Sequence, residues 1–292
     1  MTDTVRYRGM GWLRDLPDIR DYTPEHELVA PLLAKARIVA RSAKTIPKKA
    51  DLREWCPPVE DQGQLGSCTA QAGVGLVEYF ERRAGGNHVD ASRLFLYKAT
   101  RNLLKLKGDT GAYLRSTMGA MALFGVPPEK FWPYDEDAFD KEPPAFCYAF
   151  AQAYRTNTYF SLDPAGTSAT TLLGRIREYL AAGIPSMFGF TVYDSIDQAA
   201  KTGCIPFPTT KEKTVGGHAI VAVGYDDAKK VKNAARGAKE TIGALLIRNS
   251  WGEAWGEAGY GWLPYEYVHA GLAADWWTVT KAEWMDTGEF GL

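Results

Sequence analysis

The sequence predicts an α+β fold with two lobes, the first mainly helical and the second built on an antiparallel β-sheet or barrel. One observation is the helical spacing of apolar residues that recurs between residues 68 and 124. Another is the change after residue 156 to short alternating or β-branched runs, which are typical of strands. A third is the length of 292 residues, enough for one large or two small hydrophobic cores. A groove between the lobes is then the expected place for a functional site.

We divide the chain at residues 50 and 150 into an N-terminal extension (1–50), a mainly helical lobe (51–150) and a mainly β lobe (151–292). In the extension, turn residues separate aromatic and aliphatic residues, which indicates that residues 1–30 form an extended strap over the body. Residues 31–50 carry six basic side chains and no acidic one. Such a stretch is either a tether held loosely to the body or a solvated linker.

The helical lobe is expected to begin with a short strand and a proline-fixed turn within residues 48–58. A helix follows over residues 68–83, and its first half is apolar nearly all round, as in a helix buried between two lobes. Arg82, Arg83 and the glycines after them mark its end. The other expected elements are helices over 92–106 and 115–124 and loops over 126–136 and 143–153.

The β lobe follows from alternating and β-branched runs separated by turn residues. The charged segment 226–243 joins two of its strands and is either a solvated hairpin tip or an arm that binds a partner. The expected elements are a helix over 168–182 and strands over 156–162, 186–194, 218–225, 244–247, 259–263 and 274–284.

A cysteine stands where a loop turns into the central helix. Gly63 and Gly66 supply a loose turn, Ser67 is a good N-cap residue, and Cys68 opens the helix. The positive end of the helix dipole and the unpaired N–H groups there favour a thiolate, which is the nucleophilic form of cysteine.

Three other polar residues have a meaningful spacing from this cysteine. Gln62 lies six residues before Cys68, near enough to direct amide N–H donors at a carbonyl oxygen under attack by the sulfur. His218 follows at a separation of about 150 residues, in GGHAIVAVGYDD, and Asn249 about 31 residues later, in LLIRNSWGEAWGEAGYGW. Each alone is more often a core or surface residue, but the order Cys, His, Asn at this spacing is typical of a thiol protease.

From about residue 51 to its end, the chain resembles the papain-like cysteine peptidases, and among them a bacterial, xylellain-like branch. The most specific motifs are QGQLGSC, GGHAIVAVGY and RNSWGEAWGEAGYGW. The resemblance implies a papain-like two-lobed fold with the active site between the lobes. It implies that Cys68 is the nucleophile, His218 the general base and acid, Asn249 the residue that orients His218, and Gln62 part of the oxyanion hole.

The resemblance also implies four substrate-binding residues. Gly111 and Ala112 lie where the family pairs its backbone with the substrate's P2 residue, although a surface turn that caps the next helix explains them equally well. Gly217 lies near the specificity pocket, and Trp251 would shield the hydrogen bond between histidine and asparagine and line the primed side. Leu65 replaces a family cysteine, so the nearby family disulfide is absent.

The activity implied is that of an endopeptidase that works through a Cys–His dyad, resting as thiolate and imidazolium, and a thioester acyl-enzyme. A further hypothesis is that the strap runs near or into the groove and lowers this activity. The alternatives are an acyltransferase that uses the same thioester and a catalytically silent peptide-binding protein. Neither is excluded by the motifs, although no dyad member is missing.

Composition limits the partners. A net charge of −1 gives no reason to expect nucleic acid, and no apolar run is long enough to cross a membrane. We expect no cofactor and no metal, since there is no C-x-x-C pair, and a peptide or protein as substrate. Cys56, Cys147 and Cys204 leave the disulfide state open. The N-terminus lacks the features of a signal peptide, so a cytoplasmic location is expected, with signal-independent export as an alternative.

Overall fold

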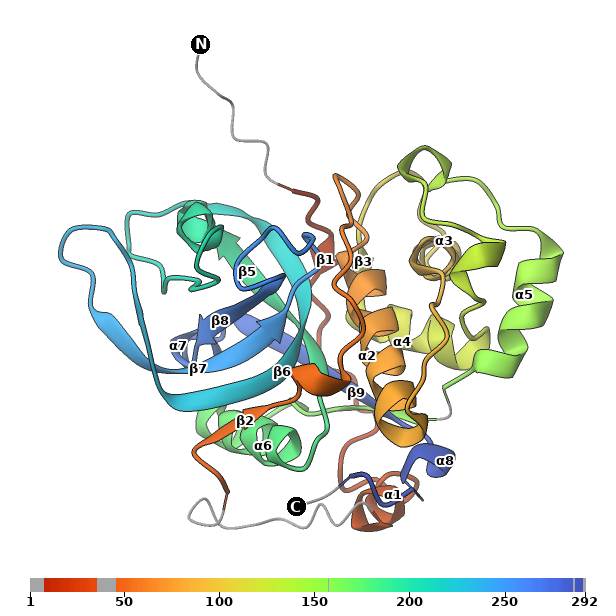
Figure 1. Ribbon diagram of the computed structural model, residues 1–292, viewed down its shortest axis with the longest axis horizontal. Coiled ribbons are helices and arrows are strands. Elements are labelled where there is room, and N and C mark those ends of the chain that lie inside the picture. The colour runs from red at the N-terminus through yellow and green to blue at the C-terminus, as the bar shows by residue number, and fades with distance from the viewer. Residues whose placement is uncertain (1–7, 36–45, 157, 286, 291–292) are drawn as a thin grey trace.

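The computed structural model describes residues 8–35, 46–156, 158–285 and 287–290. Helices lie on one side of the molecule and a twisted sheet on the other, with the long helix α2 (Cys68–Gly85) between them (Figure 1). Helix α2 packs against strands of the sheet and against other helices, so its residues from Cys68 to Phe80 are buried on every face. This explains why the first half of this helix is apolar nearly all round.

The helical side consists of α3 (Arg93–Leu103), α4 (Leu114–Leu123) and α5 (Ala145–Ala151) (Figure 1). The short 3₁₀ turns η1 (Arg53–Trp55), η2 (Glu129–Phe131), η3 (Glu136–Ala138) and η4 (Gln152–Tyr154) occur in the segments around them. The expectation of a loop over residues 143–153 was wrong, because α5 and η4 occupy most of it. Gly86 caps the C-terminal end of α2, with a φ of 78° that glycine reaches easily.

The sheet is open and mostly antiparallel, so of the two expected forms the described residues adopt the sheet and not a closed barrel. Its strand order is β4–β9–β5–β6–β7–β8, with β2 also paired to β6. The strands are β2 (Lys49–Asp51), β4 (Thr158–Ser161), β5 (Ser186–Tyr193), β6 (Thr214–Lys232), β7 (Glu240–Arg248), β8 (Tyr260–Pro264) and β9 (Ala273–Thr280).

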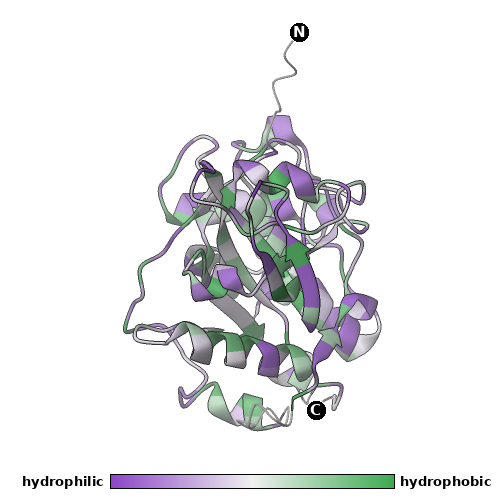
Figure 2. Cartoon of the chain, turned by 90° about the vertical axis from the view of Figure 1, so that its left-hand side faces the viewer, coloured by the Kyte–Doolittle hydropathy of each residue, from purple (hydrophilic) through white to green (hydrophobic). Residues whose placement is uncertain are grey.

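Short helical elements complete this lobe. They are α6 (Ala169–Ala181), η5 (Asp194–Ala199) and α7 (Glu266–His269). Helix α6 carries hydrophobic and hydrophilic residues along its length (Figure 2) and buries one apolar face that includes Leu172 and Ile176. Strands β6 and β7 pair as far as Lys232 and Glu240, so the charged segment 226–243 is largely a β-hairpin.

The N-terminal extension is held at two places. Strand β1 (Trp12–Leu13) pairs in parallel with β3 (Ala112–Tyr113) between the lobes (Figure 1). Helix α1 (Ala30–Lys35) packs beside α8 (Ala282–Met285) near the other chain end, with Val29 and Leu33 buried. Much of the basic stretch, residues 36–45, lies outside the described residues. None of the helices in the described part of the chain is long and apolar enough to span a bilayer.

Candidate active site

Cys68 is the first residue of α2 and is fully buried. Ser67 takes the N-cap position, but its hydroxyl bonds to the Tyr134 hydroxyl at 2.7 Å and makes no side-chain cap of the helix. The backbone N–H groups of Cys68 and Thr69 lie near the sulfur and act to lower the pKa of the thiol. The helix end thus presents N–H groups to the sulfur, as the sequence predicted, while the Ser67 side chain holds the loop to Tyr134.

His218 lies in β6, on the strand that packs against α2. Its Nε2 is 2.8 Å from Oδ1 of Asn249, which also accepts a hydrogen bond from the backbone N–H of Ser250 at 2.8 Å. The backbone N–H of Ala219, the next residue after His218, interacts with the sulfur of Cys68. Cys68, His218 and Asn249 are separated by about 150 and 31 residues in the sequence, and they lie close together at the seam between the lobes.

Two aromatic side chains enclose the imidazole of His218. Trp251 stacks on it with ring centroids 4.5 Å apart and an interplanar angle of 23°, and Phe190 approaches edge-on at 5.9 Å. Both rings are buried. The hydrogen bond between His218 and Asn249 consequently lies in an apolar surround, which strengthens it and fixes the plane of the ring. The sequence singled out Trp251 for this position, whereas Phe190 carried no motif.

Gln62 is oriented by hydrogen bonds at both ends of its amide. Its Oε1 accepts from the Ser250 hydroxyl at 2.6 Å, so its Nε2 must point the other way. That nitrogen donates to the carbonyl oxygens of Gly9 and Leu65, both at 2.8 Å. Ser250 was not predicted as a site residue. The available signal was its place beside Asn249 in the block RNSWGEAWGEAGYGW.

Residues of the strap lie against the candidate site. The ion pair of Arg8 with Asp61 and a bond of 3.2 Å from the Gly9 N–H to the Gly63 carbonyl hold it on one side. On the other side of Cys68, the carbonyl of Gly11 accepts a hydrogen bond of 2.8 Å from the backbone N–H of Ala112. The backbone of this segment therefore passes directly over the cysteine.

All four residues predicted to bind substrate lie beside the strap. Gly111 has a φ of 73°, and a Cβ there would overlap the Gly11 carbonyl. A Cβ on Gly217 would lie 2.8 Å from the Trp12 carbonyl oxygen and 2.9 Å from its indole ring. Ala112 pairs with Trp12 in the short sheet, and Trp251 lines a pocket that also includes Met10.

Burial of the covered site acts against the expected ion pair. Burial raises the pKa of the Cys68 thiol to about 11, against the opposing effect of the nearby N–H groups. Burial also lowers the pKa of His218 to about 4, against the effect of its bond with Asn249. With the strap in place, burial therefore disfavours the charged form of both groups, because the strap and the packed lobes exclude the water that would solvate the charges.

The four cysteines are free thiols. Cys56 Sγ donates to the Leu52 carbonyl at 3.5 Å and Cys147 Sγ to the Phe131 carbonyl at 3.6 Å, so these two do not pair with each other. In the described residues, no three His, Cys, Asp or Glu side chains gather in a way that could hold a metal ion.

Comparisons with known proteins agree with this geometry. A family model described as papain family cysteine protease matches residues 46–278. A peptidase C1-like protein of Acanthamoeba polyphaga mimivirus is 31% identical over 293 residues, covering 96% of this chain and 89% of that protein. Cathepsin K of Gallus gallus is 29% identical over 212 residues, covering 70% of this chain and 54% of that protein.

Solved structures give the same result. The crystal structure of xylellain, a cysteine protease from Xylella fastidiosa, superposes with a TM-score of 0.72 at 33% identity, over 94% of this chain and 96% of that one. The bromelain protease of Ananas comosus shares the fold at a TM-score of 0.58 and 19% identity, over 80% of this chain and 99% of that one. From its family match, its relatives and its fold, the chain belongs to the papain family of cysteine proteases and is a papain-like thiol hydrolase.

Proposed function

We propose that this chain is an endopeptidase that hydrolyses peptide bonds through Cys68 and His218, and that its own strap restrains it. The observation that carries the proposal is the convergence of three groups on one point of the seam. These are the sulfur at the start of α2, the imidazole held by Asn249, and the Gln62 amide held by Ser250. A nucleophile, an oriented base and a directed N–H donor are what acyl transfer requires.

Catalysis begins once the strap has left the seam. The thiol proton passes to Nδ1 of His218, which has no hydrogen-bond partner among the described residues. The sulfur then bonds to the carbonyl carbon of the peptide, and the C=O electron pair moves onto oxygen. The Nε2 of Gln62 and the N–H of Cys68 donate to this oxyanion, at about 3 kcal/mol for such a donor.

The remaining steps return the enzyme to its starting state. The imidazolium gives its proton to the leaving amine as the C–N bond breaks, which leaves a thioester on Cys68. The imidazole then takes a proton from water as the water oxygen attacks the thioester carbon. Collapse of the second tetrahedral species releases the carboxylic acid and restores the thiol with the proton held by His218. Asn249 keeps the ring oriented throughout and, being neutral, does not oppose its positive charge.

Three contacts support restraint by the strap. The Gly9 carbonyl already accepts the N–H of Gln62 that the oxyanion would need. The Gly11 backbone presents its N–H to the sulfur of Cys68, so it offers a donor and not a carbonyl carbon at that point. The strap also pairs with Ala112 where the backbone of a substrate would pair. A substrate must displace all three contacts before it can react.

The test uses the full chain with Gly9→Glu and Gly11→Glu, called here the released variant. Side chains at these positions would overlap the backbone of Leu65 and Gly66, so the strap cannot seat. We expect hydrolysis of fluorogenic dipeptide substrates to rise by at least about tenfold if the strap is seated nine-tenths of the time or more. Gly85→Glu with Gly174→Glu is the matched control, because a Cβ at either glycine meets nothing within 4 Å.

Adding Cys68→Ala to the released variant should abolish turnover, and turnover that persists would contradict the catalytic assignment. Equal rates in the wild type and the released variant would reject restraint by the strap while leaving the peptidase assignment intact. Labelling of Cys68 by an epoxysuccinyl inhibitor without hydrolysis would favour acyl transfer to an amine. No labelling of the released variant would favour a silent binding protein.

A further inference from the structure

The two N–H donors of the proposed oxyanion hole lie at the two ends of one short loop, residues 62–67. The Gln62 side chain is on its first residue, and the backbone N–H of Cys68 follows directly after its last residue, Ser67. Both donors can bind one oxyanion only if the loop keeps them at the right distance from the same point. The contacts that hold the ends of this loop therefore matter for the reaction.

One phenol group joins the two ends of the loop. Tyr134 lies between η2 and η3, and its hydroxyl donates a hydrogen bond of 2.9 Å to the backbone carbonyl of Gln62. Because the single phenol proton is used in this bond, the Ser67 hydroxyl at 2.7 Å must donate to the phenol oxygen. The oxygen of Tyr134 thus sets the separation between Gln62 and Ser67.

Resting on the peptidase function above, we propose that Tyr134 is a positioning residue for the reaction. Its hydroxyl holds Gln62 and Ser67 at the spacing that lets the Gln62 amide and the Cys68 N–H donate to the same oxyanion. Tyr134 acts through the loop and not on the substrate, so it is not a catalytic residue.

A small hydrophobic cluster holds the ring of Tyr134 and the middle of the loop together. The buried members of this cluster are Leu65, Leu94 and Ala138. Leu65 belongs to the loop itself, and its carbonyl accepts the Gln62 Nε2 at 2.8 Å. The loop is therefore anchored to the helical lobe in the middle by an apolar side chain and at both ends by the Tyr134 hydroxyl.

Charged residues hold the backbone of Tyr134. Its N–H donates a hydrogen bond of 2.5 Å to Oε1 of Glu129, and this oxygen lies 3.2 Å from the buried guanidinium of Arg93. Arg93 is the first residue of α3 and also pairs with Glu60, two residues before Gln62. Helix α3 thus supports both Tyr134 and the segment that leads into Gln62.

These contacts persist when the strap leaves, because the partners of Tyr134 belong to the helical lobe. Burial raises the pKa of Tyr134 to about 12, against the opposing effect of hydrogen bonds from Ser67 and Gln71. The phenol therefore remains protonated, and a donor to the Gln62 carbonyl, near neutral pH. The Gln62 amide itself loses its bond to the Gly9 carbonyl on release, so the support from Tyr134 then matters more.

The test compares Tyr134→Phe with its parent in the released background of the full chain. The change removes one oxygen atom and keeps the ring. We expect kcat for a fluorogenic dipeptide substrate to fall at least about tenfold with little change in KM, because a misplaced donor costs most when charge develops on the substrate oxygen. The released parent and Tyr134→Phe are compared well below the Tm of both, so that a loss of stability does not lower the rate.

Tyr148→Phe is the matched control. The Tyr148 hydroxyl also has two hydrogen bonds, with Glu142 and Asn102, but it lies on α5 at the outer edge of the helical side (Figure 1). We expect this variant to keep the kcat of its parent. An unchanged kcat in Tyr134→Phe would overturn the positioning role.

A reaction without an oxyanion separates positioning from a merely structural role. Iodoacetamide alkylates Cys68 by displacement at a saturated carbon, so no charge develops on a carbonyl oxygen. We expect Tyr134→Phe to alkylate within about twofold of its parent, since this rate follows the thiolate and its access. A fall in alkylation as large as the fall in kcat would show that the variant disturbs Cys68 itself, and would overturn the proposal.

Binding of a peptide aldehyde gives a readout that does not depend on turnover. The Cys68 sulfur bonds to the aldehyde carbon, the C=O electron pair moves onto oxygen, and the thiol proton passes to His218. Tyr134→Phe should weaken the aldehyde about tenfold and spare the matching peptide alcohol, which forms no such adduct. If the aldehyde behaves so but the released parent hydrolyses no peptide, the peptidase function fails and the positioning role stands. A parent that neither hydrolyses peptide nor binds the aldehyde more tightly than the alcohol would overturn both.

Discussion

The orientation of the Gln62 amide depends on the Ser250 hydroxyl at one end and on the Leu65 carbonyl at the other. Ser250 Oγ donates to Oε1 at 2.6 Å, and the Ser250 carbonyl accepts the Gln62 backbone N–H at 2.9 Å. Without this hydroxyl, and with the strap displaced, only the bond from Nε2 to the Leu65 carbonyl would resist rotation of the amide, which presents its oxygen, an acceptor, to the oxyanion when it flips. Ser250 therefore joins the sheet lobe, which carries the base, to the loop that carries the oxyanion donor.

We predict that Ser250→Ala lowers kcat about tenfold with little change in KM, because the lost hydrogen bond matters most when negative charge develops on the substrate. Steady-state kinetics in the released background measures this. Ser168→Ala is the control, since Ser168 caps α6 at a distance from the site and its loss should lower Tm without changing kcat. A raised KM with normal kcat would contradict the assigned role.

Single residues also mark where prediction from sequence succeeds and where it stops. Cys68, His218, Asn249 and Gln62 each stand in a local block whose order and spacing can be read directly, and the structure brings them together. The contacts of Ser250 with Gln62 and of Asp275 with Trp12 join residues 188 and 263 positions apart, which no local pattern encodes. The effect of burial on the pKa values of Cys68 and His218 could not be predicted either, because it depends on the strap that covers them.

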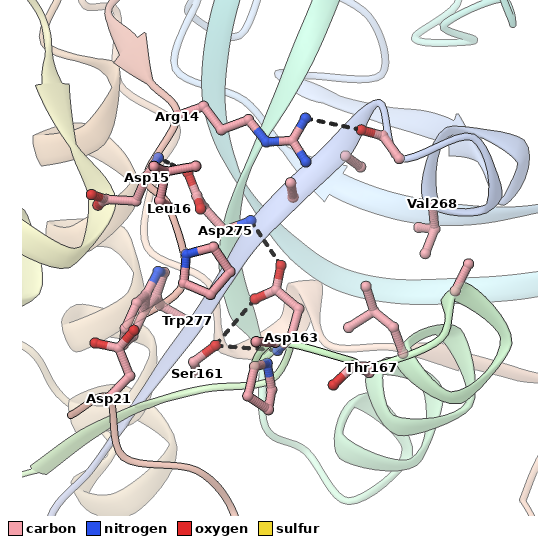
Figure 3. A pocket seen from close by; sticks show the side chains of 18 of the residues that line it. Arg14, Asp15, Leu16, Asp21, Ser161, Asp163, Thr167, Val268, Asp275 and Trp277 are labelled. Atoms are coloured by element: carbon pink, nitrogen blue, oxygen red, sulfur yellow. Dashed lines mark hydrogen bonds between the residues drawn. The ribbon is translucent and has the colours of Figure 1, made fainter. Parts of the chain in front are cut away.

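At the scale of the elements, the strap buries acidic groups where it contacts the body of the protein, and Asp15 is one of them (Figure 3). Burial raises the pKa of Asp15 to about 6 from an ordinary 3.8, with the Arg115 guanidinium acting against this and Asp275 and Asp21 reinforcing it. Burial raises the pKa of Asp275 as well. A carboxyl whose pKa is raised on docking favours docking while it is protonated. Its contribution is fully present below about pH 4 and is lost as the pH rises through about 6.

We therefore predict that the strap restrains the enzyme more strongly at pH 4 than at pH 7. The rate of the released variant divided by that of the wild type should therefore fall as the pH rises from 4 to 7. A rise of about two units in the pKa of Asp15 would change this ratio by about a hundredfold, but we expect about tenfold, because Asp15 is partly solvated. Taking the ratio cancels the pH dependence of the catalytic groups. Asp15→Asn should flatten the profile, and a ratio that grows with pH would contradict this account.

Helices and strands could be predicted from the sequence where the apolar residues recur with the regular spacing of a helix or of a strand. The helix beginning at Cys68, the helix over 168–182 and the strand over 186–194 agree with α2, α6 and β5 to within two residues at each end. Helix α5 escaped prediction because its buried face consists of two small residues, Cys147 and Ala151, while its large rings Phe146 and Phe150 are exposed and pack with Phe131 in a surface cluster. Tertiary contacts, and not periodicity, define that helix.

At the scale of the whole molecule, the extension joins parts that are distant in sequence. Its first part lies between the lobes, and α1 lies beside the C-terminal helix α8 (Figure 1). The aromatic rings of Trp284 and Phe290 pack on Phe80 of α2, the helix that begins at the cysteine. The extension is thus held both in the seam and at α1, so the strap can leave the seam while the contact of α1 with α8 still holds it to the protein.

The central claim is that the seated strap buries Cys68 and His218 and so disfavours their charged forms, and that its release favours the reactive ion pair. The most direct measurement is the rate at which iodoacetamide alkylates Cys68 at pH 7, followed by peptide mass mapping to separate it from the other three thiols. We predict that the released variant reacts at least about tenfold faster than the wild type, because thiolate is the reacting form. Equal rates in the two proteins would contradict the account.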